Sequence, residues 1–332
     1  MSTIRARTRN LLVPKYCTEQ SNPKNNKNHL NNENRFKLLI KQLDNEIKKE
    51  GVNLLCFQEV SYKWGDRLKL YFQEQNFSTF DAHYGYWRNN NMGIMIAWNQ
   101  NIFTATNFHR DVVADSIYTK LPENKSKKIY YYYKMMEYIK YFGTNLYDFI
   151  NYYLPYIYKH EDNIFKNIET MSCEKLAKLR KNVLLSIVLK DKNNNKFLVS
   201  NYHMPCLFNY PSVMMKHTET CLKLIKLYSE YEGAIPYLWG GDFNSTPNKD
   251  VYKRINESMT SLNKDGMDNE PDTIYCYTKR LGEFKGAIDY IFLSDGFKNI
   301  IPKKTEKLKK YLPNEDYPSD HISLGGSIEL DV

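Results

Sequence analysis

The stretch Leu238-Trp239-Gly240-Gly241-Asp242-Phe243-Asn244-Ser245-Thr246-Pro247 decides the fold class. The apolar run 234–239 has the length of a buried strand, and the glycines, acid, amide and proline after it are typical of a turn. In an extended chain Asp242 and Asn244 point to the same side, at the strand end where open α/β sheets place their chemistry. A turn that only caps a helix beginning near Asn248 is the alternative interpretation.

Strands alternate with helices along the rest of the chain. Apolar runs predict strands at 3–12, 52–60, 92–98, 182–190, 196–202, 287–293 and 322–330. Helical spacing predicts helices at 35–49, 66–75, 212–231 and 249–255. Residues from about 116 to 181 are polar, aromatic and helical in pattern, which indicates an insertion that either packs on the core or clamps over a substrate. Without a tandem repeat or a clear linker, we expect one α/β domain over residues 1–332.

The composition indicates the cellular compartment and the kind of binding partner. The 332 residues are 42% hydrophobic, no run approaches the roughly 20 apolar residues of a membrane span, and no apolar segment follows the N-terminal arginines. The six cysteines are scattered, so neither zinc nor a disulfide framework is expected, and we predict an intracellular, cytoplasmic protein without a membrane partner. The net charge of +9 favours a polyanionic partner such as nucleic acid, although lysine-rich surfaces also serve solubility alone. The 28 tyrosines fit a codon bias towards AT and carry little weight.

Polar side chains stand at or near the ends of several predicted strands. They are Asn10, Glu59, Asn201, His203, Asp242, Asn244, Asp289, Asp320 and His321. Alone, a glutamate after an apolar strand is more often solvent-facing than ligating, and a single histidine is more often structural. Together they offer oxygen ligands for a hard cation and two imidazoles that can hold phosphate or move protons. Since no cysteine joins them, Mg²⁺ is favoured over zinc, with Mn²⁺ as the alternative.

Several motifs resemble a known family when taken in their order along the chain. Phe57-Gln58-Glu59-Val60, Gly241-Asp242-Phe243-Asn244, Ile288-Asp289-Tyr290-Ile291 and Ser319-Asp320-His321 resemble the endonuclease/exonuclease/phosphatase superfamily. Longer matches at 241–247, 251–253, 284–292 and 317–324 resemble its branch of nocturnin and carbon-catabolite-repressor-type deadenylases. One departure is Tyr202, where that branch usually has a small threonine before the histidine of its strand motif.

The resemblance implies a fold and a set of roles. The fold is a DNase I-like four-layer α/β sandwich of two packed mixed β-sheets flanked by helices. Glu59 is implied as the main metal ligand, helped by Asn10 and Asp320. Among the catalytic residues, Asp242 orients or deprotonates water, Asn244 holds the phosphate or the metal, His203 donates to a phosphate oxygen, and His321, oriented by Asp289, stabilises charge. Substrate contacts are implied for Phe284, Phe208 and Asn201.

The predicted activity follows from this likeness. We expect a Mg²⁺-dependent phosphodiesterase, most simply a 3′ exoribonuclease of the deadenylase kind acting on single-stranded RNA. The alternatives are a nucleotide phosphatase that removes the 2′-phosphate of a dinucleotide, as the nocturnin likeness implies, and a DNA endonuclease or phosphoinositide phosphatase. A binding module without activity is the least favoured reading, because every catalytic position is filled. No leucine-rich repeats that would recruit a protein scaffold are recognised in the chain.

Overall fold

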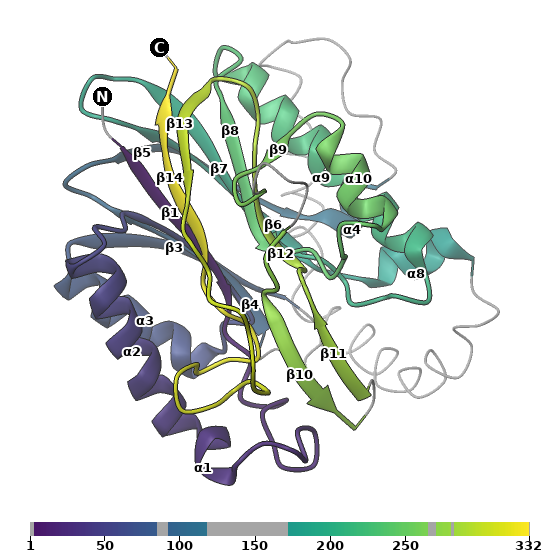
Figure 1. The fold of residues 1–332 in the computed structure, drawn as a ribbon. Helices are drawn as coiled ribbons and strands as arrows, with labels where there is room; N and C mark the ends of the chain where they lie inside the picture. Colours follow the sequence, from purple (N-terminus) through teal and green to yellow (C-terminus); the bar gives the residue numbers. More distant parts are fainter. Residues whose placement is uncertain (1–2, 85–91, 118–171, 265–269, 280–281, 332) are drawn as a thin grey trace, which may run out of the picture.

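The computed structural model describes residues 3–84, 92–117, 172–264, 270–279 and 282–331. Two six-stranded mixed sheets lie face to face (Figure 1). The strands of the first, in spatial order, are β13 (Phe297–Pro302), β14 (Leu324–Leu330), β1 (Ile4–Asn10), β2 (Leu54–Gln58), β4 (Met92–Asn99) and β3 (Phe77–Tyr84). The strands of the second are β5 (Thr104–Val112), β6 (Val183–Lys190), β7 (Lys196–His203), β8 (Tyr237–Asp242), β12 (Asp289–Leu293) and β9 (Thr260–Ser261).

Helices cover the outer face of each sheet and complete four layers (Figure 1). The first sheet is covered by α2 (Asn32–Lys48) and α3 (Tyr62–Glu74). The second is covered by α8 (Cys173–Leu179), α9 (Pro211–Tyr231) and α10 (Asp250–Asn256). The shorter elements are α1 (Lys27–Leu30), α4 (Val113–Ser116) and a two-stranded ribbon of β10 (Ile274–Thr278) and β11 (Gly282–Gly286). None of the described helices combines the length and apolar character needed to cross a membrane.

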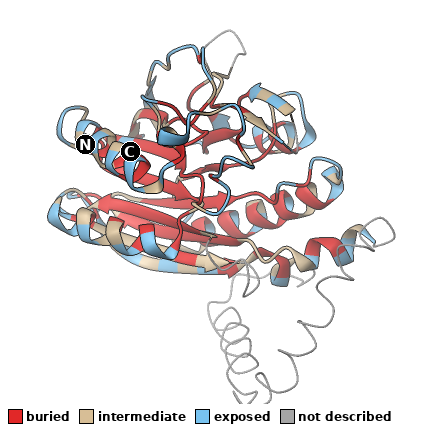
Figure 2. Ribbon diagram, turned by 90° about the horizontal axis from the view of Figure 1, so that it is seen from below, coloured by how far each residue is buried: buried red, intermediate tan, exposed pale blue. Residues whose placement is uncertain are grey.

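The core lies between the sheets, where the strands are buried along most of their length (Figure 2). Alternate residues of each strand point inwards, so that Cys56 and Ile96 of one sheet belong to the same buried cluster as Ile187 and Leu238 of the other. The sheets approach closely at Gly240, where a Cβ would lie 3.3 Å from Cys56 Sγ. The predicted fold class of two packed mixed sheets flanked by helices is confirmed.

Strand direction brings the polar strand ends together. β1 runs parallel to β2, and Asn10 pairs with Gln58 at the last position of both strands. β7 runs parallel to β8, so that His203 pairs with Asp242 at their ends. The antiparallel β12 begins beside that end, with Asp289 opposite Asp242. Parallel strands end at the same edge of a sheet, and the two sheets therefore deliver their polar residues to one place.

Most predicted elements are present, with informative exceptions. β3, β5, β10, β11 and β13 were not predicted, because they lack a continuous apolar run; β5, for instance, alternates between exposed and half-buried residues. The extended geometry expected through Asn244 is wrong, since its φ of 48° is left-handed and its N–H donates to Asp242 Oδ1. The alternative of a helix cap is also wrong, because α10 begins at Asp250 with Lys249 as its cap.

The helical insertion falls largely outside the described residues. Residues 118–171 are not described, and only α4 and α8 represent the ends of the predicted segment 116–181. Helix α8 begins as predicted, with Ser172 Oγ accepting from the Lys175 N–H. The pairing of β1 with β14, the first and last strands, supports one domain over residues 1–332, which stays a prediction.

His217 of α9 forms a buried polar contact behind the second sheet. The Tyr202 hydroxyl lies 2.7 Å from its Nδ1, and its Nε2 lies 3.1 Å from the carbonyl oxygen of Ala177 in α8. Tyr202 therefore points towards the helices, away from the strand ends, which explains how a large residue is tolerated at this position. Burial lowers the pKa of His217 from 6.5 to about 4, and the charge of Arg180 acts in the same direction against the Ala177 hydrogen bond.

We expect the stability of the protein to fall as the pH drops from about 6.5 to about 4, partly because of His217. In this range the unfolded chain binds a proton at His217 that the folded chain does not bind, so acid favours unfolding by up to about 3 kcal/mol. Urea unfolding of the wild type and of His217→Gln, which keeps one donor and one acceptor, measures this effect. The stability difference between the two proteins should be constant above pH 7 and shift in favour of the variant towards pH 4. Parallel curves over the whole range would contradict this assignment.

Candidate active site

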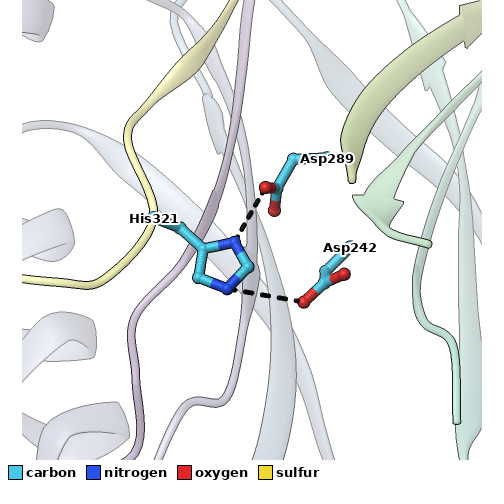
Figure 3. Close-up of side chains that lie close together, drawn as sticks. All are labelled: Asp242, Asp289 and His321. Carbon is cyan, nitrogen blue, oxygen red and sulfur yellow. Dashed lines mark hydrogen bonds and ion pairs between the residues drawn. The ribbon is translucent and has the colours of Figure 1, made fainter. Parts of the chain in front are cut away.

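Asp242, Asp289 and His321 form the most compact group at the converging strand ends (Figure 3). One ligand atom from each lies within 4.8 Å of the others, and all three side chains are buried. His321 Nδ1 lies 2.7 Å from Asp289 Oδ2, and its Nε2 lies 3.9 Å from Asp242 Oδ2. The Asp289 carboxylate thus fixes the ring so that its second nitrogen faces Asp242.

Asn10 and Glu59 extend this group towards the first sheet. The Asn10 amide donates to Asp242 Oδ2 at 2.9 Å and to Glu59 Oε1 at 3.1 Å, and therefore bridges two carboxylates from different sheets. The Asn10 side-chain oxygen accepts from the Leu12 N–H. In this arrangement the amide nitrogen, and not the oxygen, faces the carboxylates of Asp242 and Glu59. Val13 N–H donates to Glu59 Oε2 at 2.9 Å, and Glu59 has a left-handed φ of 55°. A non-glycine residue held in this conformation is typical of functional sites.

His203 completes the group from the end of β7. Its Nε2 lies 3.6 Å from Asp242 Oδ2 and 4.0 Å from Glu59 Oε1. Its Nδ1 lies 2.6 Å from the hydroxyl of Tyr84, at the end of β3. Tyr84 was missed by sequence reasoning, because β3 lacks a strong strand pattern and one tyrosine among 28 carries no signal.

Asn244 and Asp320 lie at the edge of the group. The Asn244 amide donates to the Met204 carbonyl at 2.9 Å, which ties the turn after β8 to the chain after β7. Asp320 Oδ1 lies 3.8 Å from His321 Nε2, so this imidazole faces carboxylates on two sides. The structure thus gathers eight of the predicted site residues at one place, namely Asn10, Glu59, His203, Asp242, Asn244, Asp289, Asp320 and His321.

The three predicted substrate-binding residues are placed differently. Asn201 is fully buried between the sheets, where its amide donates to the carbonyls of Phe57 and Met95. It holds the sheets together and is separate from the carboxylate group. Phe284 packs against the buried residues of the β10–β11 ribbon, and Phe208 is 45% exposed after β7. No ring contact joins Phe208 to Phe284 within the described parts of the chain.

Burial and crowding of carboxylates shift the proton affinities in the site. Burial, and then the neighbouring Asp289, raises the pKa of Asp242 to about 6, against the opposing effect of the two histidines. Burial also raises the pKa of Asp320. Burial by itself lowers the pKa of His321, but Asp289 and Asp320 outweigh it and hold that pKa well above its usual value. His321 is therefore a cation near neutral pH, with its Nε2–H facing Asp242 and Asp320.

The donor set fits a hard divalent cation. The negative charge of the carboxylates in this group exceeds the positive charge that its two histidines can carry. In addition, Asp289 Oδ1 is buried without a hydrogen-bond donor among the described residues. Such an orphaned oxygen in the group with Asp242 suits a cation that takes oxygen ligands. The absence of cysteine from the group argues against a soft metal.

Comparison with known proteins identifies the family to which this arrangement belongs. The sequence profile of the Endonuclease/Exonuclease/phosphatase family matches residues 25–321. The chain belongs to this family. The match covers the strand ends after β2, β7 and β8 and the His321 motif, so seven of the eight gathered residues lie within it, and Asn10 precedes it.

Individual relatives narrow the branch of the endonuclease/exonuclease/phosphatase family. The chain is 30% identical over 166 residues to a probable CCR4-Not complex 3′-5′-exoribonuclease subunit Ccr4 from Encephalitozoon cuniculi, covering 43% of this chain and 34% of that protein. It is 33% identical over 122 residues to human Nocturnin, covering 33% of this chain and 28% of that protein. The crystal structure of ANGEL2, a 2′,3′-cyclic phosphatase, superposes with a TM-score of 0.71 at 15% identity, covering 99% of this chain and 96% of that one.

These matches confirm the predicted superfamily and its nocturnin and deadenylase branch. The structural likeness confirms the fold, and the predicted class of enzyme, a hydrolase of phosphodiester bonds, agrees with the family. The chain spans about a third of the length of the curated relatives it matches.

Arg35 supports the site of this family member from behind. It is 2% exposed on α2, and its guanidinium donates to the carbonyls of Leu11, Leu12 and Pro318. Leu11 and Leu12 follow Asn10, and Pro318 precedes Asp320 by two residues. One buried cation thus joins the two loops that carry these site residues, and its charge lowers the pKa of Asp320 against the larger effect of burial.

We expect Arg35→Met to lower the free energy of unfolding by at least about 3 kcal/mol, because several buried carbonyls lose their donor. Arg35→Lys, which keeps the charge but not the planar fork of donors, should lose less. Urea unfolding measures both. Arg67→Met is the matched control, since Arg67 of α3 is a half-buried arginine that stacks on Phe36 and pairs with the carboxylate of Glu33. Equal losses for Arg35→Met and Arg67→Met would contradict the proposed support.

Proposed function

We propose that the protein is a divalent-cation-dependent hydrolase of phosphodiester bonds that shortens single-stranded RNA from its 3′ end. The observation that carries this proposal is the joint placement of Glu59, Asp242 and two differently oriented histidines at the strand ends of two sheets. Phosphodiester hydrolysis requires a cation, an aligned water molecule and donors for the phosphate oxygens, and this group has side chains for each requirement.

Each residue of the group has a role that its geometry supports. Asp242 takes the proton of the attacking water, because its carboxylate is held by Asn10 and by the Asn244 N–H. His203 donates from Nε2 to a non-bridging phosphate oxygen. His321, held by Asp289, directs a charged N–H at the oxygen that becomes negative in the transition state. Asn244 holds the phosphate or the cation from the turn after β8.

The cation would be held by Glu59, together with Asp320 and with Asn10 if its amide turns. Asp242, Asp289 and His321 are the more compact set, but the Asp289 hydrogen bond to His321 favours orientation of the ring over coordination. When bound, a divalent cation supplies positive charge against the negative charge that develops on the phosphate. Mg²⁺ is the proposed ion, because the donors are oxygen atoms, and Mn²⁺ is the alternative.

The relatives and the charge of the chain favour RNA as the substrate. One relative is named as a 3′-5′-exoribonuclease and another as a 2′,5′-phosphodiesterase, which are both activities on phosphodiester bonds. The net charge of +9 suits a polyanion. Phe284 and Phe208 are proposed to contact the bases, as aromatic rings that bind single strands do. The nocturnin-like alternative, a phosphatase acting on the 2′-phosphate of a dinucleotide, rests on the Nocturnin matches.

We expect the purified protein with Mg²⁺ to convert a 5′-labelled RNA with an oligoadenylate tail into a ladder of shorter products. Chelation of the cation by EDTA should abolish the ladder, and added Mg²⁺ should restore it. Asp242→Asn and Glu59→Gln should each lower the rate at least about a hundredfold, since they remove the base and a cation ligand. The measurement is a time course on denaturing gels.

Glu33→Gln is the control for these variants, because Glu33 is an exposed glutamate on α2, paired with Lys63 and Arg67. It should cleave at the wild-type rate. An unchanged rate for Asp242→Asn in a clean preparation would refute the proposed site. Release of phosphate from NADPH without any shortening of RNA would instead select the nucleotide phosphatase, and cleavage of DNA alone would select the endonuclease.

A further inference from the structure

Tyr84 lies outside the sequence motifs and contacts a histidine of the site. It ends β3 in the first sheet and contacts His203, which ends β7 in the second. The Tyr84 hydroxyl lies 2.6 Å from His203 Nδ1, and the two rings meet edge to face with centroids 6.3 Å apart. His203 is 6% exposed, so its Nδ1 is shielded from solvent by this contact.

The surroundings of His203 decide which nitrogen carries the proton. Its Nε2 faces Asp242 Oδ2 at 3.6 Å and Glu59 Oε1 at 4.0 Å. A lone pair directed at two carboxylates is repelled, whereas an N–H is attracted. The proton therefore belongs on Nε2, which leaves the Nδ1 lone pair as an acceptor for the tyrosine hydroxyl.

Tyr84 is suited to be the donor of this hydrogen bond. Burial, followed by the charges of Glu59 and Asp242, raises the pKa of Tyr84 well above its usual value. The phenol thus keeps its proton and donates it to Nδ1. A second contact fixes the backbone of the histidine, because the Asn182 amide donates to the His203 carbonyl at 2.7 Å. His203 is thereby held both at its ring nitrogen Nδ1 and at its backbone carbonyl.

We propose that Tyr84 is a positioning residue that holds the His203 imidazole in its Nε2–H form and directs that N–H at the bound phosphate. This inference rests on the proposed function for the identity of the phosphate. Tyr84 touches neither the reacting atoms nor the proposed cation ligands through its hydroxyl, and acts through His203 alone. Partners of this kind typically change activity by about tenfold or more when they are removed.

The chain contains a matched control for this contact. The Tyr202 hydroxyl lies 2.7 Å from His217 Nδ1, so the same two residue types meet through the same atoms. There, however, Nε2 faces the Ala177 carbonyl behind the second sheet, not the carboxylates. Tyr202→Phe removes a tyrosine–histidine hydrogen bond of similar length, 2.7 Å against 2.6 Å, whose histidine lies outside the proposed site.

The direct test is the tautomer of His203 in the full-length protein labelled with ¹⁵N-histidine. Imidazole ¹⁵N–¹H correlation spectra distinguish Nδ1–H from Nε2–H forms, and the His203→Gln spectrum identifies the His203 signals among the seven histidines. We expect the Nε2–H form in the wild type. In Tyr84→Phe, the Nδ1 resonance should move towards that of an unbound lone pair and Nε2–H should exchange faster with water. These signals in Tyr202→Phe should stay as in the wild type.

The kinetic test uses the same variants on the RNA substrate. Tyr84→Phe should lower kcat about tenfold with little change in KM, because the Nε2–H donor strengthens mainly in the transition state. The double variant Tyr84→Phe/His203→Gln should be no slower than His203→Gln alone, as expected if Tyr84 acts only through His203. Tyr202→Phe should keep the wild-type kcat.

Either experiment can overturn the proposal. An Nδ1–H form of His203 in the wild type would refute it, as would an unchanged His203 spectrum in Tyr84→Phe. Additive losses of kcat in the double variant would show that Tyr84 acts independently of His203. Because the spectra need no substrate, a wild type that leaves RNA intact but shows the Nε2–H form would contradict the proposed function and not the proposed contact.

Discussion

The burial of several carboxylates at one place is the constraint that organises this structure. Asp242 and Asp289 pair across neighbouring strands of the second sheet. Glu59 and Asp320 approach them from the first sheet. Burial, and then the neighbouring Asp289, raises the pKa of Asp242, because like charges brought together away from water raise one another's energy. A chain that only needed stability would place apolar residues there, because replacing buried charges by well-packed apolar groups is often neutral or stabilising.

The surrounding residues lower the electrostatic cost of burying these carboxylates, and they do so from different distances. His321 contributes a positive charge in direct contact, and the Asn10 amide shares two donors between carboxylates of different sheets. Arg35 contributes a charge from behind, where it also holds the loops after β1 and before Asp320. None of these neutralises the group completely, and Asp289 Oδ1 keeps an unused lone pair. The remaining negative charge is what makes the group suited to a divalent cation.

The fold and the candidate site residues could be predicted from the sequence for the same physical reason. Buried strands read as apolar runs, and a carboxylate or imidazole directly after such a run is noticeable, as with Glu59 and Asp242. Such apolar runs do not predict geometry that is set by tertiary contacts. The left-handed φ of Asn244 and the outward-turned oxygen of Asn10 are set by hydrogen bonds to Asp242 and Leu12. The half-buried strand β3, and Tyr84 with it, lacked any pattern that local reasoning recognises.

Tyr84 and Tyr202 show why residue type and partner do not by themselves determine a role. Both donate from a phenol to a histidine Nδ1. The difference lies at the other nitrogen of each ring. Where Nε2 meets a backbone carbonyl, the pair joins α8 and α9 to the sheet, and burial there lowers the pKa of His217 to about 4. Where Nε2 meets Asp242 and Glu59, the same contact turns a histidine into a directed donor. The catalytic value of a buried hydrogen bond is thus decided by what faces the opposite side of the group it holds.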